Sequence, residues 1–236
     1  MSCAEPGHAG LIAVDLHVHT WYSADSLARP EAILRAAERR GLGAIAITDH
    51  NCIAGALYLR ERVSMPVIVG EEIRTAEGEI IGLFLREEIS AGLTLAETVA
   101  AIREQGGLIY IPHPADTLRR STVSRRGLLS IIHQAHMIEA FNARVLLPRD
   151  NQEAQALAHR YRLPVGAGSD AHTATEVGRA RLLLPPWDWQ SPASFLEAAR
   201  AGKLEGRLSA PIFHGASTLA KLLRRFGLVP QQCPRP

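Results

Sequence analysis

The chain has 236 residues, of which 47% are apolar and 21% are charged, and its formal net charge at pH 7 is +2. This composition is typical of a globular protein with a substantial hydrophobic core. A net charge so close to zero gives no basis for stable binding of duplex nucleic acid, although a local arginine cluster could still hold a phosphate.

Neither the cysteines nor the apolar runs indicate export or membrane insertion. Cys3, Cys52 and Cys233 are too few and too scattered for a disulfide framework, and none forms a Cys-x-x-Cys pair, which favours a reducing compartment. Cys52 is expected to pack as a small apolar side chain. Residues 1–10 lack a cationic start followed by an apolar stretch, and no later run reaches the ~20 apolar residues of a membrane span. We therefore expect a cytoplasmic protein without a membrane partner, and the sequence leaves its oligomeric state open.

Short apolar runs rich in β-branched residues alternate with helix-like segments along most of the chain. Strands are predicted over residues 11–16, 43–48, 66–70, 108–111, 137–141 and 164–167. Helices are predicted over residues 30–40, 93–105, 127–134, 149–161, 192–202 and 217–226. Residues 79–85 are expected to form an additional strand that pairs with residues 68–74 through a turn at Glu77-Gly78. This alternation implies a largely parallel sheet in one domain.

Residue types that bind metals recur where the predicted strands end. In an extended backbone, residues i and i+2 point to the same face, so His17 and His19 can converge on one ion. The carboxyl ends of parallel strands collect reactive groups at one edge of a sheet. The groups at the later strand ends are Asp49 with His50, Glu71 with Glu72, His113, Glu139 with Asn142, and Asp170 with His172. Their recurrence at the same end of successive strands indicates a common site.

Each motif also has a structural explanation when it is taken alone. The His-x-His pair can be a satisfied polar edge, Asp49 and Asn51 suit a capped turn, and His113 between two prolines suits a rigid turn. Glu71 and Glu72 would repel each other unless one faces solvent and the other meets a cation, and Glu72 is predicted to face inward. The remaining histidines are predicted to be structural or surface residues: His8, His133, His136, His159 and His214.

Five histidines with several carboxylates, and no cysteine at these positions, point to zinc, manganese or iron. The candidate ligands exceed what one ion needs, so we expect a cluster of two or three divalent ions. Paired ions roughly 3.5 to 4 Å apart are a common device for phosphoester hydrolysis. A bridging hydroxide, formed from a water whose pKa is lowered to about 7, would attack phosphorus while the ions neutralise charge on the phosphoryl oxygens.

As a set, the motifs resemble those of the PHP (polymerase and histidinol phosphatase) family. The resemblance rests on Asp15-Leu16-His17-Val18-His19-Thr20 with Tyr22-Ser23 and Asp25-Ser26, Thr48-Asp49-His50-Asn51, Gly70-Glu71-Glu72, Pro112-His113-Pro114 and Gly168-Ser169-Asp170-Ala171-His172. It covers roughly residues 11–181. It implies an α/β fold with a single distorted TIM-like (β/α)7 barrel, here placed at residues 11–213. Residues 1–10 would form an N-terminal extension, and residues 214–236 a C-terminal helix and frayed tail.

The resemblance also implies a metal-dependent phosphoesterase and a set of site residues. The metal ligands that it implies are His17, His19, Asp25, His50, Glu72, His113, Asp170 and His172. Glu72 would bridge the ions, and Asp170 and His172 would have direct catalytic roles at the cluster. This chain departs from the family in two places. The position of Asp25 is a histidine in some relatives, and the additional histidine or cysteine ligand that is common near residues 139–147 has only Glu139 and Asn142 as counterparts. Occupancy of a third metal position therefore stays open.

Arginines beyond the strand ends suggest that the substrate carries phosphate. The expected substrate-binding residues are Arg119, Arg120, Arg125, Arg126, Asn142 and Arg144. The planar guanidinium fork can hold two phosphate oxygens, whereas a neutral amide or ester offers it no anionic partner. We expect at least one of these arginines to clamp the substrate phosphate. The alternative is a solvated surface loop whose charges have no specific role.

The chain is far shorter than the replicative polymerases that contain a PHP domain, so we expect a small phosphorylated substrate, either a phosphomonoester or a nucleotide. An alternative is an amidohydrolase-like enzyme, because amidohydrolases also begin with His-x-His on a barrel strand. Many of them need a carboxylated mid-barrel lysine as the metal bridge, whereas Lys203 and Lys221 both follow the Asp170-Ala171-His172 motif. A non-catalytic metal-binding module is the remaining alternative.

Overall fold

The computed structural model describes residues 10–230 and Cys233. The predictions for residues 1–9, including Cys3 and His8, and for most of the tail after residue 230 lie outside this part of the chain. Within it, nine strands form one sheet. They are β1 (Ile12–Val18), β2 (Ala44–Ile47), β3 (Val67–Thr75), β4 (Gly78–Leu83), β5 (Leu108–Ile111), β6 (Met137–Asn142), β7 (Val165–Gly168), β8 (Ala180–Leu184) and β9 (Lys203–Gly206).

The sheet curls into a nearly closed barrel. Its strand order is β7-β6-β5-β4-β3-β2-β1-β8-β9, with parallel pairs on both sides of an antiparallel β4 and with β8 and β9 antiparallel at one edge. The chain after β7 returns to β1, because Asp170 N–H donates to the His17 carbonyl at 2.8 Å and His19 N–H donates to the Ala171 carbonyl at 2.9 Å. The expected single-domain, distorted barrel is confirmed, and its distortion lies in the antiparallel strands.

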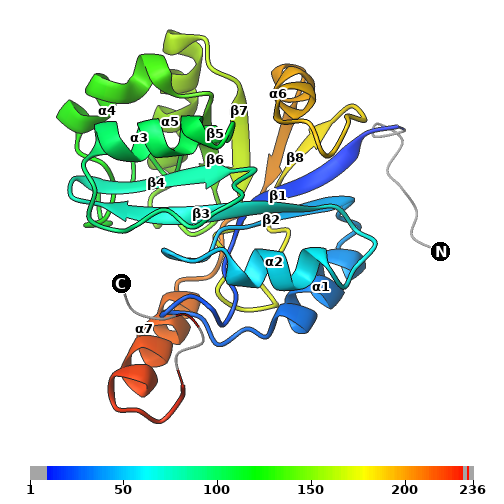
Figure 1. Ribbon diagram of the computed structural model, residues 1–236, viewed down its shortest axis with the longest axis vertical. Coiled ribbons are helices and arrows are strands. Elements are labelled where there is room, and N and C mark those ends of the chain that lie inside the picture. The colour runs from blue at the N-terminus through cyan, green and yellow to red at the C-terminus, as the bar shows by residue number, and fades with distance from the viewer. Residues whose placement is uncertain (1–9, 231–232, 234–236) are drawn as a thin grey trace.

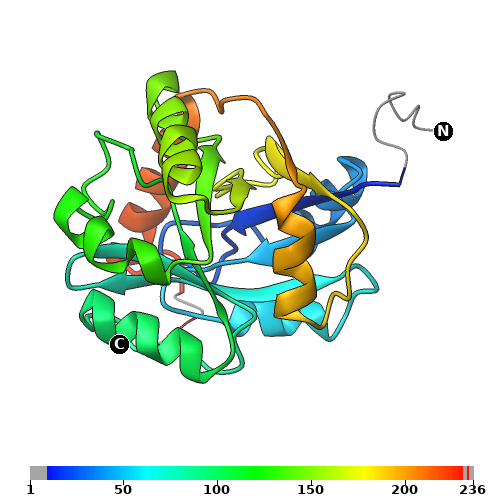
Figure 2. The same cartoon turned by 90° about the horizontal axis from the view of Figure 1, so that it is seen from above.

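Most of the helices pack around the outside of the sheet, and the last one stands apart from it (Figures 1 and 2). In the described residues they are α1 (Pro30–Arg39), α2 (Ala54–Arg60), α3 (Leu95–Glu104), α4 (Arg125–Ile131) with a 3₁₀ turn (Ile132–Gln134), α5 (Pro148–Tyr161), α6 (Pro192–Arg200) and α7 (Ile212–Arg225). All six predicted helices are confirmed, whereas α2, β8 and β9 were not predicted. None of these helices combines the length and the apolar character that a membrane crossing requires.

Local sequence explains where the helices begin and end. α1 begins at Pro30, whose missing N–H would have no partner in the first turn, and it is closed by Gly41, which has a φ of 69°. α3 begins with a capping box in which the Thr94 hydroxyl accepts from Glu97 N–H and the Glu97 carboxylate accepts from Thr94 N–H. The observed bounds of α1 and α3 lie within two residues of the predicted ones, whereas α7 begins at Ile212, five residues before its predicted start.

The hydrophobic core has two layers, which follow from the alternation of side chains along each strand. Leu16 and Tyr110 are fully buried among the side chains that fill the barrel interior. Ile45 points to the other face, where it packs with Ile33 of α1 and Leu59 of α2. A filled interior leaves the ends of the barrel as the place for a site.

The third strand extends beyond Gly70, where a strand end was predicted, along the segment predicted to pair with residues 79–85. β3 continues past Gly70 to Thr75, because Glu71 and Glu72 pair with β4 through Gly82 and Ile81. The hairpin with residues 79–85 is confirmed, but the expectation that one of the two acids faces solvent is wrong, because both are fully buried. Glu71 Oε2 accepts a hydrogen bond from Ile89 N–H at 2.9 Å, and burial raises the pKa of its carboxyl to about 8.

The pKa of Glu71 makes a prediction about stability. A carboxyl whose folded pKa lies above its unfolded value of 4.5 makes folding less favourable as pH rises from about 4.5 to about 8. Replacing Glu71 by Gln keeps an acceptor for Ile89 N–H and removes this titration. The unfolding free energy of Glu71→Gln should therefore exceed that of the parent by a margin that grows with pH over this window, at most about 1.4 kcal/mol per unit. Urea denaturation at pH 5, 6, 7 and 8 measures the margin, and parallel profiles would contradict it.

The cysteines differ from their prediction. Cys52 is buried as expected, but it forms a disulfide with Cys233 across a sequence separation of 181 residues. The expectation of reduced cysteines is therefore wrong for this pair, and the cysteines no longer support a cytoplasmic location. The bond joins the end of the described chain to the segment that directly follows His50 and Asn51.

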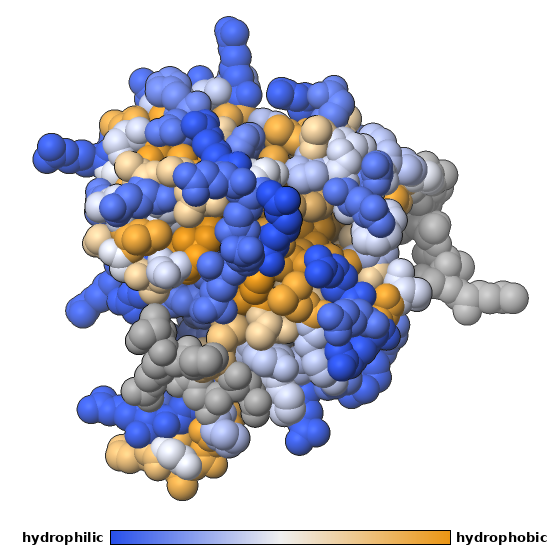
Figure 3. Space-filling view, viewed as in Figure 1, coloured by the Kyte–Doolittle hydropathy of each residue, from blue (hydrophilic) through white to orange (hydrophobic). Residues whose placement is uncertain are grey.

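α7 stands apart from the helices that surround the barrel and lies below the sheet in Figure 1. It is attached by Arg224, whose buried guanidinium donates to the carbonyls of Trp21, Ser23 and Ser26 at 2.6 to 2.8 Å. Its outer face remains apolar and exposed, as Figure 3 shows at the lower end of the molecule, with Ile212, Leu219, Leu222 and Phe226 each at least 48% exposed. Through Arg224, α7 fixes the loop that carries Asp25.

Candidate metal centre

The site begins at the end of β1, where the regular ladder is interrupted. The pairing of β1 with β2 slips between Asp15 and Val18, which is a β-bulge of the kind that re-aims side chains near active sites. His17 and His19 leave this bulge with their Nε2 atoms only 3.0 Å apart. Both imidazoles are completely buried, so the predicted convergence of this pair is observed.

The Glu72 carboxylate lies at the centre of four imidazoles. Its Oε2 is 3.3 Å from His17 Nε2, 3.3 Å from His19 Nε2 and 3.2 Å from His50 Nδ1. Its Oε1 is 3.0 Å from His113 Nε2. Asp170 approaches from the other side, with Oδ1 3.8 Å from His17 Nε2 and 3.5 Å from His19 Nε2. One buried carboxylate thus contacts ligand candidates from β1, β2 and β5.

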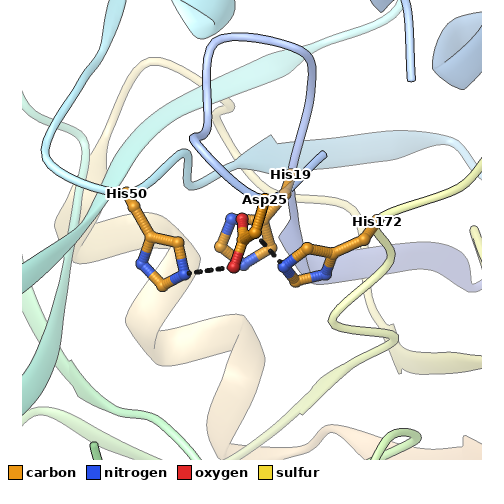
Figure 4. A group of neighbouring side chains, drawn as sticks. All are labelled: His19, Asp25, His50 and His172. Atoms are coloured by element: carbon orange, nitrogen blue, oxygen red, sulfur yellow. Dashed lines mark ion pairs between the residues drawn. The ribbon is translucent and has the colours of Figure 1, made fainter. Parts of the chain in front are cut away.

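A second group lies beside the first and is drawn in Figure 4. Asp25 is placed between two imidazoles, with Oδ2 3.3 Å from His50 Nε2 and Oδ1 3.2 Å from His172 Nε2. The ring of His19 lies behind Asp25, with its centroid 4.2 Å from that of His172. Together with the atoms around Glu72, the structure brings all eight predicted ligands into one connected cluster.

The nitrogen and oxygen atoms of the cluster are arranged as ligands of divalent cations. His172 Nδ1–H donates to the Asp170 carbonyl at 2.8 Å, so in the neutral imidazole the Nε2 lone pair faces the Asp25 carboxylate. Among the described residues, Glu72 Oε2, Asp170 Oδ1 and Asp25 Oδ1 are buried without a hydrogen-bond donor. Atoms that ligate one zinc ion at about 2.0–2.2 Å lie roughly 3.0–3.5 Å apart, which matches most of the spacings in the cluster.

The pKa shifts around the site also favour binding of divalent cations. Burial lowers the pKa of His172 to about 4, so this imidazole is neutral at pH 7 and free to ligate. Burial also opposes ionisation of Asp25, but the imidazoles of His172 and His50 hold its pKa well below the ordinary value. His50 shows the complementary shift, since the carboxylates of Asp25 and Glu72 outweigh its burial and raise its pKa to about 10. Buried carboxylates therefore stay ionised and draw positive charge into the cluster.

The second nitrogen of the His17 imidazole is held by a neighbouring carboxylate. His17 Nδ1–H donates to Glu139 Oε1 at 2.9 Å, which directs Nε2 toward the cluster. Glu139 Oε2 accepts from His113 N–H at 2.7 Å and from Asn142 Nδ2–H at 2.9 Å. In this structure Glu139 acts on the cluster through His17. The Asn142 amide, predicted to bind substrate, is fully buried between Glu139 and Asp170.

The backbone of the ligand segments is also interlocked. Glu72 N–H donates to the Asp49 carbonyl at 3.2 Å, and Asn51 N–H donates to the Glu72 carbonyl at 3.1 Å. His113 and Asp170 have positive φ angles of 31° and 52°, a region that costs non-glycine residues free energy and is enriched at functional sites. These contacts position the ligands before any ion binds.

A cavity of about 440 Å³ opens onto the cluster, and some of the predicted arginines line it while others do not. Arg119 and Arg120 line it, and Arg119 Nη2 is 2.6 Å from Asp170 Oδ2. Arg144 also lines it, but its buried guanidinium is held by Glu176, Ser217 and the Phe213 carbonyl. Arg125 and Arg126 lie on the first turn of α4 and do not line the cavity at the cluster. Arg125 lines a different cavity.

The cavity also contains residues that sequence reasoning missed. Glu79 approaches His50 Nδ1 and His113 Nε2, each at 3.9 Å, and belongs to a possible ligand group with His50 and Glu72. The predicted hairpin held the signal, because it places Glu79 opposite Arg74, on the same face as Glu72. Lys221 on α7 has its Nζ 3.2 Å from Asp25 Oδ2, a long-range contact that no local pattern reveals.

Comparisons with known proteins identify the family of the chain. The chain matches the PHP-associated family, PHP_C, over residues 148–204. It is 38% identical to the uncharacterized protein MJ0417 of Methanocaldococcus jannaschii over 182 residues, which are 76% of this chain and 73% of that protein. The chain belongs to the PHP domain family.

Two solved structures show the same fold. One is a two-domain protein from Bacteroides vulgatus described as containing a predicted PHP-like metal-dependent phosphoesterase, with a TM-score of 0.66, 18% identity, and coverage of 92% of this chain and 72% of that one. The other is an amidohydrolase from Chromobacterium violaceum, solved with bound sulfate and no metal. It has a TM-score of 0.57, 19% identity, and coverage of 79% of this chain and 96% of that one.

The position of Glu72 makes a prediction about metal content. After reconstitution with manganese or zinc, the parent should hold at least two ions per chain, and Glu72→Gln should lose at least one, because its carboxylate faces ligands of more than one group. Glu71→Gln is the matched control, since the neighbouring side chain is equally buried but points to the opposite face. Elemental analysis of the three proteins measures this. A parent with one ion or fewer, or equal metal content in all three, would contradict it.

Proposed function

We propose that this chain is a metal-dependent phosphoesterase that hydrolyses a small phosphorylated substrate, such as a phosphomonoester or a nucleotide. The observation that carries the proposal is the position of Glu72, whose buried carboxylate faces four imidazoles beside a cavity that Arg119, Arg120 and Lys221 line together with carboxylates. Carboxylate and imidazole ligands suit zinc, manganese or iron, and these cationic side chains suit an anionic substrate.

Two or three ions can be assigned to the cluster from its donor atoms. His17, His19, Glu72 and Asp170 would hold one, His113 and Glu72 with Glu79 another, and His50, Asp25 and His172 a third. When bound, the ions would supply an activated water and neutralise charge on the phosphoryl group. His50 could serve the ion at Glu72 or the ion at Asp25, because it faces Glu72 with one nitrogen and Asp25 with the other.

The protein's own cations would orient the substrate. Arg119 enters the cavity from the loop after His113, and its guanidinium can hold two phosphate oxygens while it stays beside Asp170. Lys221 enters from α7, and its side chain is 63% exposed, so it can turn from Asp25 to an anion in the cavity. Held in this way, the phosphoryl group would lie against the metal ligands in one orientation.

An amidohydrolase-like reaction is the second candidate, and the structural likeness to an amidohydrolase favours keeping it. Many such enzymes bridge their ions with a carboxylated lysine, whereas here the carboxylate that faces both His19 and His113 is that of Glu72. Lys221 does reach the cluster, so its place in the sequence alone does not exclude it, but it contacts Asp25 at the cavity wall. Arg119 and Lys221 in the lining favour phosphate over a neutral amide.

The proposed activity is tested with the metal-reconstituted protein and matched substrates. Phosphomonoesters and nucleotides should be hydrolysed, whereas uncharged amides and carboxylic esters should not, because they offer the cavity cations no anionic group. Asp170→Asn should fold normally and lose most of the hydrolysis, since it weakens a metal ligand. Preferential amide hydrolysis would support the amidohydrolase alternative. Full metal content without turnover on any substrate would support a binding module.

The two groups of arginines make a sharper prediction. Arg119→Met should lower kcat/KM for a phosphomonoester by about ten- to a hundredfold, or roughly 1.5–3 kcal/mol, because a charge-assisted clamp is lost. Arg125→Met is the matched control, since Arg125 lies outside this cavity, and its kcat/KM should equal that of the parent. Steady-state kinetics, with metal content measured on each sample, compares kcat/KM of the two variants with that of the parent. Equal effects of the two substitutions would remove Arg119 from the substrate site.

A further inference from the structure

A second concentration of arginines lies away from the metal centre, at the sheet edge formed by β8 and β9. It surrounds a cavity of about 230 Å³ whose lining consists of Arg40, Gly178, Arg179, Arg181, Glu205, Gly206 and Arg207. No residue of this lining also lines the cavity at the metal cluster. The two cavities are therefore separate places on the protein.

Strand pairing brings these arginines together. Arg181 lies directly opposite Glu205 in the antiparallel pair of β8 and β9. One step further along, Arg207 N–H donates to the Arg179 carbonyl at 2.8 Å, so these two residues meet at the end of the same ladder. Arg40 is the C-cap residue of α1, and it lies beside these strands because Arg181 Nη1 donates to its carbonyl at 3.2 Å. Three separate segments thus contribute guanidinium groups to one cavity.

The positive charge of this cavity is only partly compensated. Arg181 is paired with Glu205, with Nε 2.8 Å from Oε2. Within the described part of the chain, Arg40, Arg179 and Arg207 have no carboxylate at ion-pair distance, and Arg179 Nε is buried without an acceptor. Burial, followed by the neighbouring cations Arg207, Arg179 and Arg181, lowers the pKa of Arg40. Like charges gathered around a hollow repel one another unless an anion lies between them.

We propose that this cavity binds the phosphate groups of a small anionic ligand. Arg40 Nη2 donates to the Thr175 carbonyl at 3.4 Å and Arg179 Nη1 to the Leu208 carbonyl at 3.3 Å. The remaining N–H groups of these two arginines and those of Arg207 can bind tetrahedral phosphate oxygens, which accept parallel N–H bonds from a guanidinium fork. The cavity volume of about 230 Å³ leaves room for a diphosphate group. The site is independent of the hydrolytic function proposed above, because it shares no lining residue with the metal cavity.

Calorimetric titration of the full-length, metal-reconstituted protein with inorganic pyrophosphate tests the proposal. Metal content is measured before and after each titration, so that removal of metal is not counted as binding. Arg207→Gln and Arg40→Gln each remove one cation, at an exposed and a half-buried position, and each should weaken one saturable binding event at least tenfold. Both should leave kcat/KM for phosphomonoesters unchanged. Arg119→Met should leave this event intact, which separates it from binding at the metal cavity.

A parallel titration with ADP identifies the source of the phosphate. Tighter binding of ADP than of pyrophosphate would assign the site to a nucleotide, and equal binding would assign it to the phosphate groups alone. The proposal is overturned if neither probe shows a saturable event that Arg207→Gln or Arg40→Gln weakens. A protein that hydrolyses no phosphoester yet shows this event would retain the arginine site and lose the proposed hydrolytic function, so the two failures are distinguishable.

Discussion

The structure depends on the burial of one carboxylate, that of Glu72, among four imidazoles. Its two oxygens lie 3.0 to 3.3 Å from nitrogens of His17, His19, His50 and His113, and Oε2 accepts no hydrogen bond from the described residues. Buried carboxylates need positive charge beside them. Without metal ions protonated imidazoles supply it, since the carboxylates of Asp25 and Glu72 raise the pKa of His50 to about 10, and bound divalent cations would take the place of these protons. The chemistry of the site follows from this arrangement of donor atoms.

The barrel holds the cluster in place through interactions that act on the ligands indirectly. Asp15 is an example, because its buried carboxylate accepts from the N–H groups of His17, Ser169 and Gly178 and so ties β1 to the segment that carries Asp170. Glu139 directs the His17 ring, and Arg224 fixes the loop of Asp25 from α7. A site preorganised in this way does not have to arrange its ligands when an ion or a substrate binds.

Sequence periodicity predicted those parts of the site that depend on strand geometry. The i, i+2 spacing of His17 and His19 and the recurrence of polar groups at strand ends follow from the pleat and from parallel topology, and both were correct. The end of β3 was misplaced because two adjacent acids look like the end of a strand, whereas a hairpin partner can bury both. Periodicity could not predict that Arg119 lines the metal cavity and Arg125 does not, because the direction of a loop leaves no local pattern. It also could not predict the contacts of Lys221 and Cys233, which depend on long-range packing.

Anomalous X-ray scattering from crystals of the manganese- or zinc-reconstituted protein would test the central claim most directly. The account predicts at least two peaks within coordination distance of the Glu72 carboxylate, one near His17 and His19 and one near His113, with any third peak at Asp25. Peaks that all lie away from Glu72, or a single peak bound by one surface histidine, would contradict it. In that case the buried carboxylates and imidazoles would have to be held by protons alone.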